Sequence, residues 1–280
     1  MTFSIVARDG ESFGVAVASK FLAVGALVPW AHPHAGALAT QALANISYGP
    51  RGLSLLSAGR SADEVVTLLT DPDPEKEQRQ LGVVDAHGNA ESFTGRACID
   101  WAGGTIGEGY AAQGNILKGS GVVTAMAEAF ERTEGDLATR LVSALAAGDS
   151  AGGDRRGRQS AALYVVAPNG GYGGTTDIVA DLRVDDHKQP VRELARLLDA
   201  HRVLFTKPTD EDLIKITKTL GKEIDAALRA TGYLEPKGDR ARALAMFAGW
   251  ENLEERVVDG DRIDRHVLAA LRDAAAKSRR

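Results

Sequence analysis

Segments with strand character and segments with helix character are grouped in blocks along this chain, and that order restricts the possible folds. Runs rich in β-branched, aromatic and small apolar residues predict strands at residues 2–7, 13–19, 25–30, 35–42, 80–85, 90–94, 160–167 and 177–184. Apolar periodicity and helix-start signals predict helices at about residues 49–59, 61–69, 121–132, 136–147 and 191–205. A doubly wound parallel fold would alternate strands with helices. The block order instead predicts helical layers packed on mainly antiparallel sheets, an α+β fold.

The last quarter of the chain has a different pattern. Lys207 and Pro208 interrupt the preceding helix, and Thr209 with three following acidic residues caps a new one. Helices are expected there at about residues 209–220, 224–230, 240–247 and 263–275, and no strand is evident. We therefore expect a main domain over residues 1–205 and a small all-α domain over residues 209–280.

Composition excludes several classes of function. The 280 residues carry a formal net charge of −5, so no basic surplus drives binding to nucleic acid or to an anionic membrane. Cys98 is the single cysteine, which rules out a disulfide within the chain and a cysteine zinc site. No apolar run approaches the length of a membrane span and no secretory signal is visible. We expect a cytoplasmic protein.

One short motif resembles a serine hydrolase site. Residues 148–152 match the pattern G-x-S-x-G, with Ser150 at its centre and histidines downstream. That nucleophile elbow needs a strand before the serine and a helix after it. Here a helix is expected before the serine, which favours a helix end and linker. An esterase that uses Ser150 is kept as an alternative.

Other candidate ligand sites are weaker. The glycine-rich stretches 103–109 and 170–174 lack the strand–loop–helix setting of a nucleotide loop, so we expect turns there. His32 and His34 have no third ligand at a motif spacing, and the acidic cluster at 181–187 fits a solvated strand end. We expect no metal and no organic cofactor.

The N-terminus carries a stronger signal. Thr2 is small enough for the initiator methionine to be removed, and it stands at the head of the first expected strand. An N-terminal threonine holds a nucleophile and a base in one residue, because its hydroxyl attacks while its own α-amine accepts the proton. A nearby cation lowers the pKa of such an amine, and Lys20 at the end of the second strand is a candidate. An inert N-terminus and a surface lysine are the alternative.

Several segments together resemble a known family. They are SKFLAVG (19–25), VPWA (28–31), ATQA (39–42), SYGP (47–50), AGGDRRGRQS (151–160) and DLRVDDH (181–187). With the opening hairpin, which is similar to that of proteasome-type subunits, they resemble the bacterial family called domain of unknown function 1028 over about residues 2–205. That family is assigned to the N-terminal-nucleophile (Ntn) hydrolases. The resemblance implies a four-layer αββα sandwich and hydrolysis of an amide bond. Proteasome subunits have an aspartate near the lysine, where this chain has Ser19.

Further polar residues are candidates for the site. Thr40 and Gln41 end an apolar strand and are expected at the substrate, and Asn45 could supply an oxyanion hole or merely turn the chain. On a glycine-rich loop before a strand, we expect three charged residues to bind substrate: Asp154, Arg155 and Arg158. Arginine there suits a substrate carboxylate, although structural ion pairs are equally consistent with these residues.

The C-terminal segments ATGYL (230–234), WENLEER (250–256) and GDRID (260–264) resemble a peptidoglycan-binding-like module found in some members of that family. The resemblance implies a cell-wall fragment as a partner, and a docking or dimerisation module is an alternative. We expect an Ntn-type amidohydrolase, forming a homo-oligomer, that acts on a small amide or peptide-like substrate through Thr2. A catalytically silent scaffold with a binding C-terminal domain is the non-enzyme alternative.

Overall fold

The computed structural model describes residues 2–278 of the chain. Contacts divide it into a first unit that ends at Leu198 and a second unit that starts at Asp199, so the last part of helix α5 (Pro190–Phe205) is grouped with the second unit. No helix in the described part of the chain is both long enough and apolar enough to cross a membrane.

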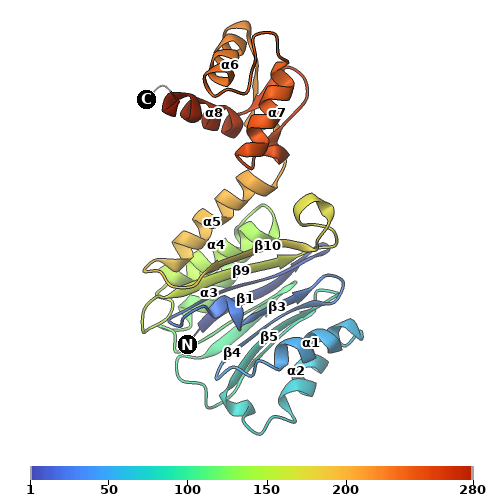
Figure 1. The fold of residues 1–280 in the computed structure, drawn as a ribbon. Helices are drawn as coiled ribbons and strands as arrows, with labels where there is room; N and C mark the ends of the chain where they lie inside the picture. Colours follow the sequence, from blue (N-terminus) through green and yellow to red (C-terminus); the bar gives the residue numbers. More distant parts are fainter. Residues whose placement is uncertain (1, 279–280) are drawn as a thin grey trace. The chain divides into compact units, whose positions relative to one another are not determined.

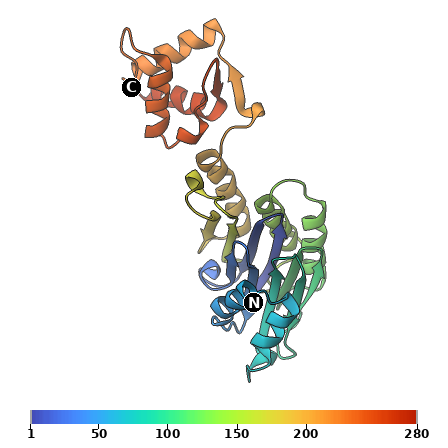
Figure 2. The ribbon, with the colours of Figure 1, turned by 90° about the vertical axis from the view of Figure 1, so that its right-hand side faces the viewer.

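The first unit contains a six-stranded sheet in which every neighbouring pair is antiparallel. Its strands, in spatial order, are β10 (Ile178–Val184), β9 (Ser160–Val166), β2 (Ser12–Ser19), β1 (Thr2–Asp9), β8 (Tyr110–Asn115) and β7 (Gly103–Gly107). Strand β1 is central, with β2 on one side and β8 on the other. Figure 2 shows this blue strand in the interior of the unit. Residues 3–7 are therefore paired with a neighbouring strand on both sides.

A second, four-stranded antiparallel sheet faces the first. Its order is β3 (Pro29–His32), β4 (Gly36–Ala42), β5 (Arg79–Asp85) and β6 (Ala90–Thr94). The strand expected at residues 25–30 is wrong in its first half, because residues Val24–Ala26 form a 3₁₀ turn before β3. Strands β4, β5 and β6 lie close to the expected positions.

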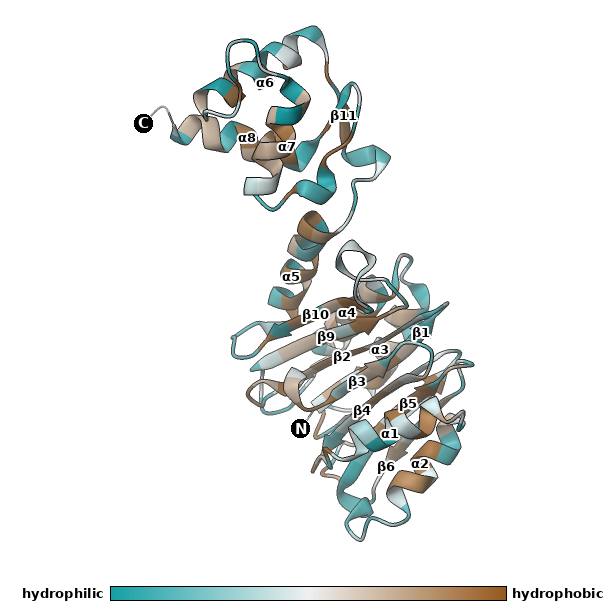
Figure 3. Ribbon diagram, turned by 45° about the vertical axis from the view of Figure 1, so that its right-hand side comes forward, coloured by the Kyte–Doolittle hydropathy of each residue, from teal (hydrophilic) through white to brown (hydrophobic). Residues whose placement is uncertain are grey.

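Helices cover the outer faces of the two sheets. Helices α1 (Tyr48–Ser57) and α2 (Ala62–Thr70) pack on the four-stranded sheet, whereas α3 (Gly121–Arg132) and α4 (Leu137–Ser150) pack on the six-stranded one (Figure 1). The capping box expected at Ser61 and Glu64 is present at the start of α2. Apolar residues concentrate in the strands and on the inward helix faces (Figure 3). The predicted four-layer αββα sandwich is confirmed.

The glycine-rich stretch at residues 103–109 is not a turn throughout, which corrects the prediction. Residues Gly103–Gly107 form strand β7, and β8 follows directly. Large neighbouring groups occupy the space that side chains would need: an added Cβ at Gly107 would lie 2.3 Å from the Tyr110 ring. Glycine here makes room for neighbours rather than for a ligand. Residues Tyr172–Gly174 do form a short turn, as expected.

Alternation along β1 assigns its side chains to two faces. Phe3, Ile5 and Ala7 belong to the core beneath α3 and α4, whereas Val6 belongs to the core between the sheets. Successive strand residues point to opposite faces. Thr2 and Ser4 therefore point into the space between the two sheets.

The second unit is mainly helical, with α6 (Lys218–Ala230), α7 (Arg240–Trp250) and α8 (Arg265–Lys277) around one apolar core. It also has a small antiparallel pair, β11 (Leu213–Lys215) with β12 (Arg262–Asp264), where no strand was expected. Thr209 caps only the 3₁₀ turn Asp210–Asp212, so the helix predicted from it is wrong.

A buried ion cluster lies in this unit. Arg256 is 3% exposed and its Nη2 contacts carboxylate oxygens of Asp212 and Asp264, each at 2.8 Å. Hydrogen bonds from the backbone and hydroxyl of Thr209, together with Arg256, hold the pKa of Asp212 at about 2. Asp264 thus pairs with Arg256, whereas Asp212 pairs with both Arg256 and the exposed Arg265, whose Nη2 lies 2.8 Å from Asp212 Oδ1.

Candidate active site

Thr2 lies at the start of the central strand and is 6% exposed. Its Oγ1 is 3.2 Å from the Oγ of Ser19, the last residue of β2, and both side chains are buried. On β2, Val15 and Val17 belong to the core between the sheets, so alternation places Ser19 on the same face as Thr2. The two hydroxyls form a pair at one end of the sandwich.

A buried network of neutral amides continues from Thr2 between the sheets. Gln41 Nε2 donates to Gln80 Oε1 at 2.8 Å, and Asn115 Nδ2 donates to the same oxygen at 2.9 Å. The same two donors lie 3.5 Å from the carbonyl oxygen of Thr2. Ser4 Oγ donates to Gln41 Oε1 at 2.7 Å. The backbone of Thr2 is thus tied to both sheets.

The sheets approach closely where this network ends. Gln113 Nε2 donates to Ser4 Oγ at 2.7 Å, and its Oε1 is buried without a hydrogen-bond partner among the described residues. An added Cβ at Gly82 of the facing sheet would lie 2.2 Å from that oxygen. The Gln113 amide therefore occupies the space that a side chain at position 82 would take.

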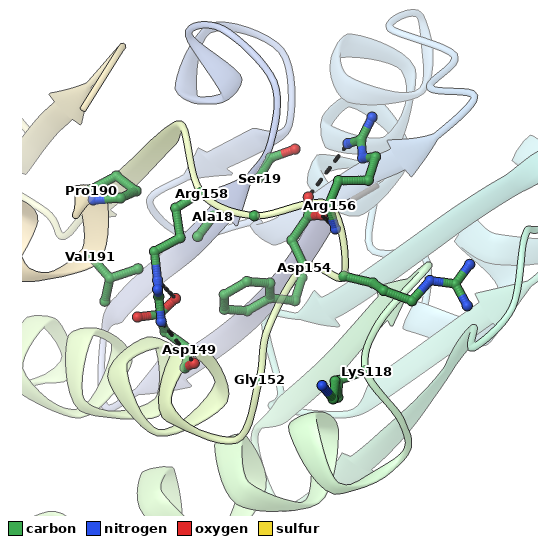
Figure 4. Close-up of a pocket in the computed structure, with 13 residues that line it drawn as sticks. Ala18, Ser19, Lys118, Asp149, Gly152, Asp154, Arg156, Arg158, Pro190 and Val191 are labelled. Atoms are coloured by element: carbon green, nitrogen blue, oxygen red, sulfur yellow. Dashed lines mark hydrogen bonds and ion pairs between the residues drawn. The ribbon is translucent and has the colours of Figure 1, made fainter. Parts of the chain in front are cut away.

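A cavity of about 310 Å³ lies next to Ser19 (Figure 4), and Thr2 is not among its lining residues. Its wall includes Ser19 and, next to Thr2 in the chain, Phe3. The other lining residues come from the β2 end, the α4–β9 loop and neighbouring segments: Ala18, Lys118, Asp149, Gly152, Asp154, Arg155, Arg156, Gly157, Arg158, Pro190 and Val191. The cavity is close to the lower limit of about 300 Å³ for small-molecule sites.

Ion pairs already engage two of its arginines (Figure 4). Arg158 Nε donates to Asp149 Oδ1 at 2.7 Å, which raises the pKa of Arg158. Arg156 Nη2 lies 3.4 Å from Asp154 Oδ2. The buried Asp154 carboxylate also accepts from the backbone N–H of Lys20 at 2.7 Å. Asp154 and Arg158, predicted as substrate-binding residues, therefore line the cavity and also hold its wall in place.

Arg155 also lines the cavity, and its role in substrate binding stays a prediction. Lys20 is exposed, and its contacts with the cavity loop are made by its main chain, because its carbonyl oxygen also accepts from Arg156 Nη2 at 2.9 Å. Ser19, and not Lys20, has the side chain beside Thr2. The role of Lys20 as an activating cation stays a prediction.

The Asn45 side chain is engaged elsewhere. Its Nδ2 donates to Asp73 Oδ2 at 3.1 Å, and its Oδ1 accepts from the backbone N–H and hydroxyl of Ser47. Hydrogen bonds, first of all from Arg79 and then from Tyr48, hold the pKa of Asp73 well below its usual range. Asn45 thus belongs to a loop cluster with these residues in this structure.

Thr40 and Gln41 end β4, and the structure separates their roles. Thr40 Oγ1 donates to the carbonyl oxygen of Asn45 at 3.2 Å, which closes the loop after the strand. Gln41 reaches Thr2 through the buried network. Of the two residues predicted to contact substrate, Gln41 is the one that contacts the first residue of β1.

Ser150 ends helix α4 and is exposed, with a glycine turn after it. This setting differs from the strand–serine–helix elbow of serine esterases. Among residues 2–278, no group of three or more histidine, cysteine, aspartate or glutamate side chains is arranged to hold a metal ion.

Sequence reasoning missed Asn115 and Lys118 and assigned Ser19 no role. Asn115 is the strand partner of Thr2 and lines a second cavity of about 270 Å³. The available signal was the i, i+2 spacing of Gln113 and Asn115, which places two amides on one face of a strand. Lys118 had no such signal, because only tertiary structure brings it to the cavity.

Comparisons with known proteins agree with this architecture. Residues 2–194 match the model of a family of unknown function, DUF1028, and residues 204–271 match the model of a peptidoglycan binding domain. The crystal structure of SPO2555 from Silicibacter pomeroyi, a DUF1028 protein, is 33% identical, with a TM-score of 0.65 over 72% of this chain and 89% of that one.

The structure of eukaryotic HslV from Trypanosoma brucei is 13% identical, with a TM-score of 0.35 over 59% of this chain and 99% of that one. No curated protein matches the chain. The family match covers more than half of the sequence. The chain therefore belongs to the DUF1028 family.

Proposed function

We propose that this protein is an Ntn-type hydrolase of a small amide or peptide-like substrate, with Thr2 as its nucleophile. The observation that supports the proposal is the contact between Thr2 Oγ1 and the Oγ of Ser19, 3.2 Å apart, because Ser19 lines a cavity that also has charged residues in its wall. The proposal requires cleavage of the bond between residues 1 and 2, because the mechanism needs a free amine on Thr2.

In this mechanism the α-amine of Thr2 takes the proton of its own hydroxyl, and Oγ1 forms a bond to the substrate carbonyl carbon. Collapse of the tetrahedral intermediate breaks the C–N bond, and the protonated amine returns its proton to the leaving nitrogen. Water, deprotonated by the same amine, then cleaves the acyl ester and restores Thr2. A free α-amine has a pKa of about 7.7–8.0, so it is a usable base near neutral pH.

The sandwich contributes rigidity to this chemistry. Chain ends are usually mobile, whereas Thr2 is paired with Asn115 on β8 and its carbonyl oxygen is approached by two buried amides. A nucleophile fixed before the substrate arrives loses little entropy in the reaction. This positioning supports a catalytic use of the first residue of β1.

The decisive experiment starts with intact mass. We expect the purified, untagged protein to be lighter than the encoded chain by one methionine residue. Thr2→Ser should retain hydrolysis of a substrate found in an amide screen, whereas Thr2→Ala should abolish it without loss of fold. Ser150→Ala is the matched control and should be silent. A retained Met1, or full turnover by Thr2→Ala, would refute the mechanism.

For the second unit we propose binding of a cell-wall peptide or glycan fragment. The match to a peptidoglycan binding domain and a cavity of about 560 Å³, lined by Arg240, Arg262 and Asp261 among others, support this role. Co-sedimentation of the full chain with purified peptidoglycan tests it, and loss of sedimentation in Arg262→Ala is the expected result. An absence of sedimentation by the unmodified chain would exclude the role.

A further inference from the structure

The charges that line the cavity beside Thr2 do not balance. Four cationic and two carboxylate side chains face it. Arg156 and Arg158 are paired with the two carboxylates. Lys118 and Arg155 are exposed and have no ion-pair or hydrogen-bond partner for their side chains among the described residues. Two positive charges therefore remain available in a small cavity.

The backbone fixes the segments that carry these two charges. Leu117 and Asp154 form an isolated antiparallel bridge. On one side of it the Lys118 N–H donates to the Gly153 carbonyl oxygen at 3.2 Å, and on the other the Arg155 N–H donates to the Ile116 carbonyl oxygen at 3.2 Å. Residues 37 positions apart in the chain are thereby held at the same wall.

Glycine at position 152 makes room for the lysine. Gly152 has a φ of +117°, and an added Cβ would lie 2.9 Å from both Cβ and Cγ of Lys118. A larger residue would push the lysine stem away from the wall. The buried Asp154 further anchors the loop, through the backbone N–H groups of Lys20 and Arg156. The two cations thus lie on two segments that backbone hydrogen bonds and Asp154 hold in place.

We propose that the cavity selects substrates that carry a carboxylate close to the scissile amide, and that Lys118 and Arg155 are the specificity-determining residues. This inference rests on the proposed function, because only a hydrolase would treat the bound carboxylate compound as a substrate. A guanidinium can bind a carboxylate through two parallel hydrogen bonds, and an ammonium adds a point charge. Ser19 lines the same cavity and its hydroxyl is 3.2 Å from Thr2 Oγ1, so the two cations lie in a cavity adjacent to the hydroxyl pair.

A binding measurement on a protein that cannot turn over separates this inference from catalysis. The full-length Thr2→Ala protein is titrated, by calorimetry or NMR, with N-acetylglycine and with its neutral analogue N-acetylglycinamide. The two ligands share an acetamide and differ in the charge of the far group. Lys118→Gln, Arg155→Gln and their combination are compared with Arg51→Gln, an exposed arginine on α1. Thermal melting confirms that each variant is folded.

We expect N-acetylglycine to bind at least tenfold more tightly than the amide at low salt. Each single variant should weaken its binding by about three- to tenfold, since hydrogen-bonded charges contribute more than exposed ion pairs. Added salt should reduce the preference, and Arg51→Gln should leave it unchanged.

Equal affinity for the two ligands, no binding of either, or an unchanged preference in the double variant would overturn the inference. These results are distinct from failure of the proposed hydrolysis. A retained Met1 with an intact carboxylate preference would remove the catalytic mechanism and leave the binding site. Hydrolysis of neutral amides with no carboxylate preference would support the catalytic mechanism and remove the carboxylate-binding site.

Discussion

Replacing Gln80 by leucine tests the amide network that supports Thr2. Gln80 is fully buried, and leucine has nearly its shape but no polar atoms. The change removes the oxygen that accepts from Gln41 and Asn115 and the nitrogen that donates to the Gly114 carbonyl oxygen at 2.8 Å. The fold should survive, with several polar groups left without partners.

The expected loss of free energy of unfolding follows from the number of buried polar groups that lose a hydrogen-bond partner. The amide nitrogens of Gln41 and Asn115 would keep only contacts of about 3.4–3.5 Å with backbone carbonyls. Each buried donor that loses its partner costs about 1–3 kcal/mol, so the free energy of unfolding should fall by about 4 kcal/mol. For a unit of this size, 1 kcal/mol corresponds to about 2–4 °C in Tm, which gives a decrease of roughly 8–16 °C.

Calorimetry measures the effect, and hydrogen exchange of the β1 and β5 amides assigns it to the first unit. Gln78→Leu is the matched control, because Gln78 is exposed two residues away and its change should stay within about 0.5 kcal/mol. A loss below about 1 kcal/mol for Gln80→Leu would show that these amides do not depend on one another. Gln80→Leu should also reduce turnover more than substrate affinity, since Thr2 would lose its support.

Three further predictions concern charge. Lys20→Ala should move the acid limb of the rate profile to higher pH by less than about half a unit, because an exposed cation favours the neutral Thr2 amine only weakly; a shift to lower pH, or above one unit, would contradict this. Arg256→Met should cost the second unit about 3–5 kcal/mol, measured by its melting, because the buried carboxylate of Asp264 loses its ion-pair partner and Asp212 keeps only the exposed Arg265; an unchanged Tm would refute it. Because the folded pKa of Asp212 is about 2, its contribution to stability is present above about pH 4 and is lost as pH falls toward 2; a second unit equally stable at pH 2 and pH 5 in denaturant titrations would be inconsistent with that.

Much of the sandwich was predictable, because its signals are local. The capping box at Ser61 and Glu64 and the apolar faces of α3 and α4 are legible in single segments of the chain. Strand β7 was not predictable from the sequence, because side chains from other parts of the chain occupy the space next to its glycines. The short strands β11 and β12 are 47 positions apart at their closest paired ends, so only tertiary contact defines them.

In the candidate site, too, only the features that depend on single residues or short segments could be predicted from the sequence. Thr2 was identified from chemistry that a single residue carries, namely a hydroxyl and an amine together. The pairing of Thr2 with Ser19 depends on the register of the first hairpin and on its approach to the cavity. Lys118 enters the site through a backbone bridge between distant segments. Asn45 was assigned by its position before a helix, whereas Asp73 and Ser47 determine where its amide points.

The close approach of Gly82 and Gln113 also limits how relatives of this protein can diverge. The two positions lie on facing sheets, and a Cβ at position 82 would overlap the Gln113 amide. Alanine at 82 therefore requires either that the Gln113 amide leaves its position in the network or that the residue at 113 is shorter. The order of the two substitutions matters, since one order passes through a clashing intermediate and the other through a cavity. Across related genomes, a small residue at one position should accompany a long one at the other.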